Sequence, residues 1–309
     1  MLDCPHYSED AENIPDTEGE AQPEEEEVSD VALADGAAFY AETAGDRIRS
    51  TGGTIVAIIG STGSGKTTLV ASIYDLLGRD ESAFDHTFAG SDTLFAFERL
   101  CHLARAASGR DVPDTEHTSR QLGLKFLHLE LVSRASLDRF HLLFSDRSGE
   151  DYEAASNKLE ACNELLEVSA ADVVLMLVDA EKLVDPALRH PTLSLVKTIT
   201  ESFVAAKLTN GTQRLLVALT KFDLVKGAPE EELSMQLFDQ TVQQLRRLFG
   251  SEFAEIIRYE IASRPTKNTV PPGTGLRELL IECTKKPVVK KYVPNPTGTP
   301  KRTFHRVRE

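Results

Sequence analysis

A phosphate-binding loop is predicted by the segment Gly60-Ser61-Thr62-Gly63-Ser64-Gly65-Lys66-Thr67. Its glycines let the backbone curl so that successive N–H groups point inward at phosphate oxygens. A helix expected to begin near Gly65 adds its positive end, and Thr68 in its first turn joins the nucleotide-binding set. Lys66 is placed to reach the β- and γ-phosphates, and the Thr67 hydroxyl to hold Mg²⁺. A plain glycine turn is the alternative, but the apolar run before the segment and the helical pattern after it favour phosphate binding.

A second motif places Asp146 at the end of an apolar run and Gly149 three residues later. An aspartate in this position can hold magnesium, usually through water, and the Gly149 N–H can sense a γ-phosphate. Turns also use Asp and Gly, so the pair carries weight mainly because it follows the second strand of an expected hairpin.

A third motif follows another apolar run and predicts which base is bound; it consists of Thr220, Lys221 and Asp223. The Asp223 carboxylate can accept hydrogen bonds from N1–H and from the exocyclic amine of guanine, whereas adenine has neither donor there. Binding ATP would leave this carboxylate desolvated and unpaired, which costs at least about a few kcal/mol. Lys221 would lie along the base plane. An N-cap before Leu224 is the alternative role for Asp223.

A weaker fourth signal is the short loop with Ser263 and Arg264, which follows an expected strand at 256–261. A backbone N–H in this tight turn can donate to the guanine O6. Short loops of this kind are common, so the signal counts only beside the other three.

The elements that position these motifs alternate between strands and helices. Apolar runs predict six strands, at 54–59, 122–132, 140–145, 173–178, 215–219 and 256–261. Helical spacing predicts helices at 66–77, 92–107, 152–168, 192–208, 230–248 and 276–283. The second strand changes its alternation near Phe126, which predicts either a bulge or a strand that begins there. The pattern predicts an α/β fold: a mostly parallel six-stranded sheet with one antiparallel hairpin strand and helices on both faces.

Charge divides the chain into three parts. Residues 1–46 hold 15 of the 49 acidic residues and none of the 34 basic ones, so the net charge of −15 comes from this segment. We expect an acidic disordered tail at 1–46, a domain at 47–283 with a helical insert at 78–121, and a mobile, basic, proline-rich tail at 284–309. The two tails can attract one another weakly, and any contact with nucleic acid is expected only through the basic tail.

The remaining composition points to a cytoplasmic location. No N-terminal apolar signal and no apolar run of transmembrane length is present. The four cysteines are far apart in the sequence and are expected to be reduced thiols.

The order of these four motifs, each after a strand, resembles the Ras-like, translation-factor-related class of P-loop GTPases over residues 54–283. More narrowly, segments 97–105, 127–129 and 145–152 resemble bacterial double-GTPase families, which are associated with multi-gene conflict systems. The resemblance implies a Ras-like fold and GTP or GDP with Mg²⁺ as ligands. It also implies a protein partner, for which a second GTPase is one candidate.

Three departures from that class affect the expected chemistry. Glu150 occupies the position where Ras-like enzymes commonly have the glutamine that orients the attacking water, and Thr220 replaces a commoner asparagine. No switch threonine follows the loop closely. Thr115 and Thr118 are the candidates, and we favour Thr118, as a catalytic residue and magnesium ligand, because it is closer to the next strand. Four arginines lie in or near the expected switch regions, namely Arg105, Arg110, Arg120 and Arg147. Each can be a solvated surface residue or can serve as a built-in arginine finger. Asp179 is expected to be structural.

We therefore expect a GTP-binding switch with slow, Mg²⁺-dependent hydrolysis, in which Lys66, Thr118, Gly149 and Glu150 serve catalysis. One alternative is a non-catalytic GTP-binding scaffold, in which Glu150 marks lost chemistry. The other is an ATP-driven P-loop ATPase, against which the Asp223 motif and the lack of an LSGGQ-like signature argue.

Overall fold

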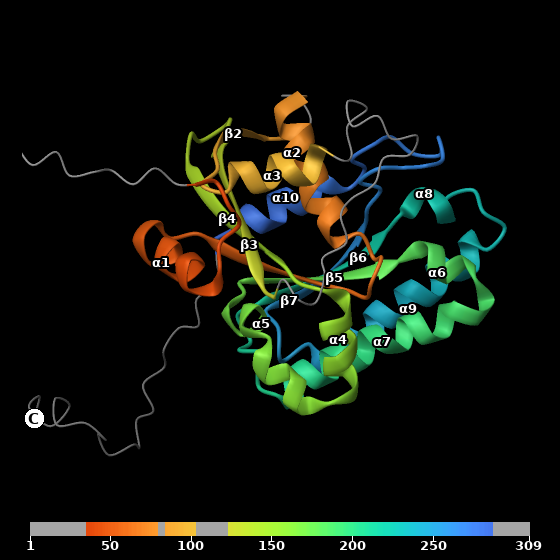
Figure 1. Ribbon diagram of the computed structural model, residues 1–309. Coiled ribbons are helices and arrows are strands. Elements are labelled where there is room, and N and C mark those ends of the chain that lie inside the picture. The colour runs from red at the N-terminus through yellow and green to blue at the C-terminus, as the bar shows by residue number, and fades with distance from the viewer. Residues whose placement is uncertain (1–34, 80–83, 103–122, 287–309) are drawn as a thin grey trace, which may run out of the picture. The chain divides into compact units, whose positions relative to one another are not determined.

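The computed structural model describes residues 35–79, 84–102 and 123–286 (Figure 1). The chain divides into two units, residues 1–33 and residues 34–309, and every described residue belongs to the second. No helix in the described ranges is long and apolar enough to cross a bilayer.

A seven-stranded sheet in the order β2-β3-β4-β1-β5-β6-β7 forms the centre of this unit. Strand β3 runs antiparallel to both of its neighbours, β2 and β4, and the pairings among β4, β1, β5, β6 and β7 are all parallel. The strands are β1 (Thr54–Ile59), β2 (His86–Gly90), β3 (Lys125–Ser133), β4 (Arg139–Asp146), β5 (Val173–Asp179), β6 (Arg214–Thr220) and β7 (Glu255–Glu260). The α/β class, the largely parallel sheet and the single antiparallel hairpin strand are confirmed.

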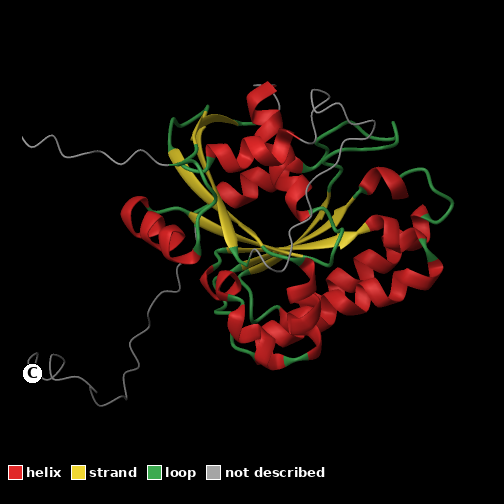
Figure 2. Cartoon of the chain, in the orientation of Figure 1, coloured by secondary structure: helices red, strands yellow, loops and turns green. Residues whose placement is uncertain are grey.

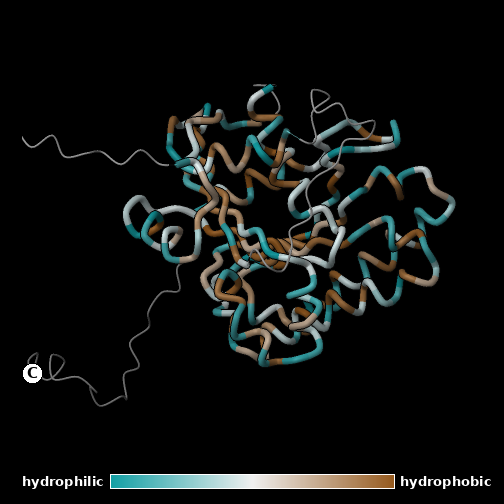
Figure 3. The backbone as a smooth tube through the Cα atoms, viewed as in Figure 1, coloured by the Kyte–Doolittle hydropathy of each residue, from teal (hydrophilic) through white to brown (hydrophobic). Residues whose placement is uncertain are grey.

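Helices cover both faces of the sheet (Figures 1 and 2). One face packs against α2 (Lys66–Arg79), α3 (Leu94–His102) and α10 (Leu276–Thr284). The other face packs against α4 (Gly149–Asn157), α7 (Pro186–Ala205) and α9 (Glu231–Phe249). Every residue of β5 and β6 is buried, as continuous apolar strands between two helical layers should be. In Figure 3 the brown, hydrophobic segments gather at the centre, where Figure 1 places the sheet.

The sheet has one more strand than the six predicted, because β2 lies inside the region expected to be a helical insert at 78–121. This strand is short, lies at the sheet edge and is only partly buried, and its pairing with β3 shifts register between Phe88 and Gly90. Such a strand has no sustained apolar alternation for a sequence pattern to detect. The helix expected at 92–107 is α3, and residues 103–122 lie outside the described ranges.

The change of phase near Phe126 is explained by where β3 begins. The strand starts at Lys125 and pairs with β4 in unbroken register from Lys125 opposite Asp146 to Val132 opposite Arg139. No bulge interrupts this hairpin, so the apolar residues before Lys125 do not belong to the strand.

Two predicted helices differ in extent from the observed ones. The helix expected at 152–168 is three short segments, α4, the 3-10 helix η4 (Leu159–Glu164) and α5 (Leu166–Ala170). The helix expected at 192–208 begins earlier, at Pro186, because the Asp185 side chain caps it by accepting a hydrogen bond from the Ala187 N–H at 2.8 Å. Two short helices, α6 (Ala180–Val184) and α8 (Phe222–Val225), follow the ends of β5 and β6.

The ordered domain begins before the expected boundary at residue 47. Helix α1 (Ala41–Thr51) precedes β1, and Phe39 exchanges two backbone hydrogen bonds with Phe126, at 2.9 and 2.8 Å. Residues 39–46, expected in the acidic tail, therefore pack with the domain, whereas residues 1–34 and 287–309 lie outside the described ranges. The acidic composition of the segment concealed the helix, because α1 buries little apolar surface of its own.

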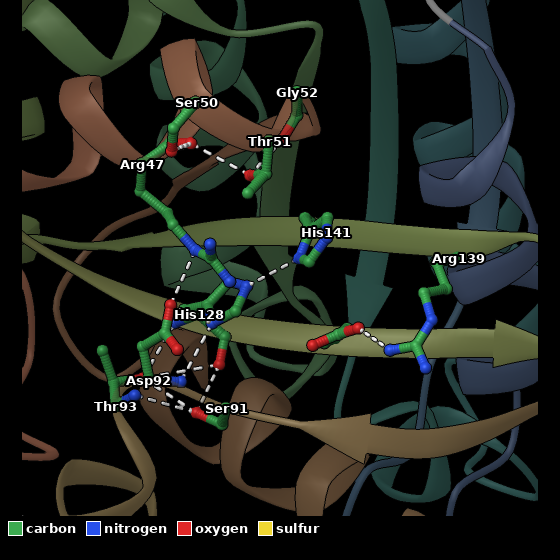
Figure 4. A network of polar contacts seen from close by, with 11 residues as sticks. Arg47, Ser50, Thr51, Gly52, Ser91, Asp92, Thr93, His128, Arg139 and His141 are labelled. Atoms are coloured by element: carbon green, nitrogen blue, oxygen red, sulfur yellow. Dashed lines mark hydrogen bonds and ion pairs between the residues drawn. The ribbon is translucent and has the colours of Figure 1, made fainter. Parts of the chain in front are cut away.

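A polar network ties α1 to the sheet (Figure 4). Arg47 on α1 pairs with Asp92 at 2.6 Å, and the Asp92 N–H donates to His128 Nδ1 at 3.0 Å. The other ring nitrogen of His128 lies 3.1 Å from Nδ1 of His141 on β4. Burial lowers the pKa of His128 to about 4, so its ring is neutral at pH 7 and donates from Nε2. Arg47 thus anchors a helix whose sequence gave little sign of docking.

Candidate nucleotide-binding site

The predicted phosphate-binding loop joins β1 to α2 at the carboxyl edge of the sheet, with α2 beginning at Lys66. Gly63 and Gly65 adopt φ values of 78° and 90°, a backbone conformation that residues with a side chain rarely take. Gly60 has no room for a side chain, because a Cβ there would lie 2.4 Å from the Ser64 hydroxyl oxygen. The loop therefore has the curled backbone that the glycine spacing predicted.

Lys66 is buried and turned toward its own loop. Its ammonium group donates to the carbonyl oxygens of Gly60 at 3.0 Å and Ser61 at 3.3 Å. Burial lowers the pKa of Lys66 to about 8, although the carboxylates of Asp146 and Glu153 act in the opposite direction. The two carboxylates do not fully offset the burial of this cation, and a bound phosphate would add negative charge beside it.

The residues expected to hold magnesium meet at the next corner of the site. The Thr67 hydroxyl donates to an Asp146 carboxylate oxygen at 3.4 Å, and both side chains are partly exposed. A hydroxyl and a carboxylate suit Mg²⁺, which takes oxygen ligands and usually keeps waters and phosphate oxygens as its other ligands. No group of three His, Cys, Asp or Glu within the described ranges could hold a metal without such help. The donor set thus fits the expected ion.

Gly149, the first residue of α4, packs directly on the phosphate-binding loop. A Cβ at this position would lie 2.3 Å from the backbone nitrogen of Thr62, so only glycine fits. One turn later, the Glu153 carboxylate accepts a hydrogen bond from the Thr62 N–H at 3.0 Å. Glu150, in the first turn of α4, is exposed.

Arg147 holds this segment to the body of the domain. Its guanidinium donates to the Glu167 carboxylate at 2.8 Å and to the Glu164 carbonyl at 2.8 Å. The Tyr152 hydroxyl also donates to Glu167 at 2.9 Å, and Tyr152 and Glu167 are both 0% exposed. Arg147 is therefore neither a solvated surface residue nor a free arginine finger, which are the two roles its position suggested.

A cleft of about 440 Å³ adjoins the loop at the end expected to bind the base. Its lining is polar and contains most of the predicted base-recognition residues: Gly63, Gly65, Thr68, Glu181, Thr220, Lys221, Asp223, Leu224, Ser263, Arg264 and Thr266. The loop with Ser263 is closed by a bridge between Ala262 and Thr274. Burial lowers the pKa of Arg264, which is partly exposed in this cleft.

Asp223 is buried and held from one side. Its Oδ2 atom accepts hydrogen bonds from the backbone N–H groups of Thr266 at 2.8 Å and Lys267 at 3.2 Å. No hydrogen bond to Oδ1 is present among the described residues, so this oxygen keeps its capacity to accept from a ligand.

Thr220 and Lys221 connect the base end of the site to the phosphate end. The Thr220 hydroxyl donates to the Ser64 carbonyl at 2.9 Å, a bond that an asparagine amide could equally make. Lys221 has φ 53° and its ammonium group pairs with Asp179 at 2.9 Å and Glu181 at 2.8 Å. Asp179 also caps α6, which agrees with the structural role expected of it.

Most of the predicted site residues thus meet at one edge of the sheet, whereas others cannot be placed. Thr115, Thr118, Arg105, Arg110 and Arg120 lie outside the described residues. Three contacting residues have no counterpart in the predicted motifs, namely Glu153, Lys182 and Thr266. The sequence signal for each was only its position within a few residues after a motif or after the end of a predicted strand.

Comparison with known protein families gives one match. A model of the Double-GTPase 2 family matches residues 54–284. A comparison of the sequence with curated proteins found no match. Among solved structures, a signal recognition particle receptor SRb-GTP/SRX complex from Chaetomium thermophilum is 17% identical with a TM-score of 0.38, over 72% of this chain and 94% of that one.

Two further structures cover slightly more of this chain but are matched over only 52% and 47% of their own length. The Ski7 GTPase-like domain of S. cerevisiae, bound to GTP, is 12% identical with a TM-score of 0.37, over 78% of this chain and 52% of that one. Roco2 RocCORdC of Methanosarcina barkeri, bound to GDP, is 14% identical with a TM-score of 0.34, over 74% of this chain and 47% of that one. The family assignment rests on the family model and not on these structures.

Proposed function

Because the chain belongs to the Double-GTPase 2 family, we propose that it is a guanine-nucleotide switch that hydrolyses GTP slowly with Mg²⁺. The observation that carries the proposal is Asp223, a buried carboxylate fixed through one oxygen and facing a cleft continuous with the phosphate-binding loop. Guanine offers two adjacent donors to such a carboxylate, and adenine offers none in that place. The cost of leaving Asp223 unpaired separates the two bases.

The phosphates would lie along the loop from the cleft toward Gly149. Lys66 would exchange its two carbonyl contacts for phosphate oxygens, and the loop N–H groups would add further donors. Thr67 and Asp146 would hold Mg²⁺, which would supply positive charge beside the phosphates. Thr118 is our candidate for a further magnesium ligand and catalytic group.

Hydrolysis is expected to be slow because Glu150 stands where Ras-like enzymes commonly have the neutral glutamine that orients the attacking water. Glu150 is exposed at the first turn of α4, and its carboxylate is repelled by a triphosphate. Intrinsic rates of Ras-type enzymes without a partner are about one turnover in tens of minutes, and we expect a similar or lower rate here. A partner protein would complete the site, and a second GTPase is one candidate for it.

The switch itself would be α4. Its first residue touches Thr62, so a γ-phosphate bound at this end of the loop must be sensed by Gly149 and the residues that follow it. We place the protein in the cytoplasm from its sequence composition, and in a bacterial multi-component system of the conflict or defence type from the family resemblance alone.

A non-catalytic GTP-binding scaffold is the second candidate. The exposed position of Glu150, and Glu153 bonded to a loop N–H, favour it because neither acid is arranged to promote attack on a phosphate. An ATP-driven ATPase is less favoured, because adenine offers no hydrogen-bond donor to the Asp223 carboxylate.

Two measurements test the proposal on the full chain. Displacement of labelled GTP by unlabelled GDP and ATP should show a preference for guanine of roughly a thousandfold or more. Single-turnover phosphate release with Mg²⁺, compared with release in excess chelator, should show slow metal-dependent hydrolysis. Equal affinity for ATP and GTP would overturn guanine recognition, and tight GTP binding without any phosphate release would select the scaffold.

A further inference from the structure

Lys182 is a second lysine directed at the phosphate-binding loop. It lies on α6, three residues after the end of β5 at Asp179. Its ammonium group donates to the Ser61 hydroxyl at 3.2 Å and lies 3.5 Å from the Thr62 carbonyl oxygen. Lys66 also contacts Ser61, through the Ser61 carbonyl oxygen at 3.3 Å, so the two cations are close enough to repel one another.

The partners of Lys182 differ from those of the neighbouring lysine at the same edge. Lys221 pairs with two carboxylates, whereas no carboxylate lies within ion-pair distance of Lys182 among the described residues. The positive charge of a partly buried ammonium group is only partly balanced when all of its partners are neutral oxygens. Two such cations converge on a loop whose N–H groups suit anions, and the Glu153 carboxylate at the Thr62 N–H holds the place that a phosphate would take.

The end of the loop that Lys182 contacts is the end away from the base. The cleft with Asp223 adjoins Gly63, Gly65 and Thr68, whereas Ser61 and Thr62 lie on the side where Gly149 packs. A nucleotide with its base at Asp223 and its magnesium at Thr67 therefore directs its last phosphate toward Ser61 and Thr62.

We propose that Lys182 binds the terminal phosphate of the nucleoside triphosphate and stabilises the charge that develops as this phosphate is transferred to water. In the reaction, a water oxygen bonds to the γ-phosphorus as the bond from that phosphorus to the β–γ bridging oxygen breaks. The electron pair of the broken bond goes to GDP, and a proton of the water passes to the released phosphate. Negative charge builds on the bridging oxygen, where an ammonium group supplied by the chain itself takes the role of an arginine finger. The inference rests on the proposed function and adds to it a catalytic residue.

The test compares triphosphate with diphosphate, because a lysine that only supports the loop would affect both alike. Lys182→Met should weaken binding of the slowly hydrolysed analogue GTPγS by roughly tenfold to a hundredfold, as expected for the loss of a charge-assisted hydrogen bond. GDP affinity should stay within about twofold. Single-turnover hydrolysis of GTP should fall by at least about tenfold, and GDP with aluminium fluoride should lose more affinity than GTPγS. Lys182→Arg should keep most of each property, since it keeps the charge.

Lys158→Met is the matched control, because it removes the same charge from an exposed lysine of the C-terminal cap of α4. It should leave all four measurements unchanged. Equal losses of GDP and GTPγS in Lys182→Met would assign the residue to loop support and overturn the proposal, as would unchanged GTPγS affinity and hydrolysis. A wild-type protein that binds no guanine nucleotide would instead overturn the proposed function, and the assignment of Lys182 with it.

Discussion

Glu153 on α4 accepts a hydrogen bond from the backbone N–H of Thr62 in the phosphate-binding loop, at 3.0 Å. A carboxylate thus satisfies a donor at the end of the loop where we place the terminal phosphate. With Gly149 packed on the same residue, α4 closes this end of the loop while the base cleft is open. The arrangement suits a diphosphate better than a triphosphate, because a γ-phosphate must displace the Glu153 carboxylate and overcome its repulsion.

Neutralising Glu153 should shift the balance between the two nucleotides. Glu153→Gln keeps an oxygen that can accept from the Thr62 N–H but removes the charge, so GTPγS affinity should rise by roughly threefold to tenfold. GDP affinity should be unchanged, and calorimetry of both ligands measures the ratio. Glu160→Gln, an exposed acid of η4, is the control. If the ratio of GTPγS affinity to GDP affinity is the same in Glu153→Gln and in the wild type, the Glu153 carboxylate does not oppose binding of the triphosphate.

Base recognition is tested at Asp223. Asp223→Asn replaces one acceptor by an amide donor, and xanthine presents an acceptor where guanine has its exocyclic amine. Affinity for GDP should fall by roughly a hundredfold or more, and xanthosine diphosphate should become the better ligand. Competition between the two diphosphates measures the change. Because the bond from Thr266 to Oδ2 also contributes to folding, the melting temperature is the accompanying control. A stable variant that still prefers GDP would contradict the assignment.

The parts of the site that the sequence predicts are those whose geometry is local. A strand, a glycine turn and a helix fix where Lys66 and Thr67 lie, and parallel strands end at one edge, which brings Asp146 and Asp223 to the same side of the sheet. The motifs therefore predicted both the fold class and most of the cleft lining.

What the sequence did not predict depends on contacts between distant segments. The edge strand β2 and the helix α1 owe their order to β3 and to the Arg47–Asp92 pair, and neither has an apolar pattern of its own. The burial of Arg147 requires Glu167, which lies 20 residues away. Glu153 and Lys182 reach the loop from helices whose packing only the folded chain determines.

Nucleotide affinity should depend on pH through Lys66. Burial places its pKa at about 8 in the free protein, and a bound phosphate must raise that value because it favours the charged form. Below pH 7.5 the lysine is charged in both states and affinity is insensitive to its titration. Above pH 8 binding must recharge the lysine, so affinity should fall with rising pH, by at most about tenfold per pH unit.

The measurement is GDP affinity between pH 7.5 and 9, together with proton uptake by calorimetry in buffers of different ionisation enthalpy. Lys182→Met should move the onset of the decline to higher pH, because Lys182 lowers the pKa of Lys66. Affinity that stays constant up to pH 9 with no proton uptake would show that Lys66 is fully charged in the free protein.

The buried pair of Arg147 and Glu167 should be a large contributor to stability. Arg147→Met leaves the Glu167 carboxylate buried and unpaired, and should reduce the free energy of unfolding by about 3–5 kcal/mol. Adding Glu167→Gln removes the orphaned charge but keeps an acceptor for the Tyr152 hydroxyl, so it should recover much of the loss. Urea denaturation measures both variants. A loss below about 1 kcal/mol in Arg147→Met would mean that the pair is not closed in solution.

The last prediction concerns Glu150 and distinguishes a slow enzyme from a scaffold. An exposed carboxylate one residue after Gly149 repels the triphosphate and cannot donate a hydrogen bond to it, so Glu150→Gln should raise the rate of single-turnover GTP hydrolysis or leave it unchanged. An amide at this position can both accept from water and donate to phosphate, which is the reason to expect an increase. Because Glu150 contributes no hydrogen bond of its own among the described residues, the substitution should not alter the melting temperature or GDP affinity, and these serve as controls. A large fall in rate at constant GDP affinity would show that Glu150 acts as a working base, with α4 moving to bring it to the γ-phosphate. No hydrolysis in either form, with GTP still bound tightly, would leave the scaffold as the function of this chain.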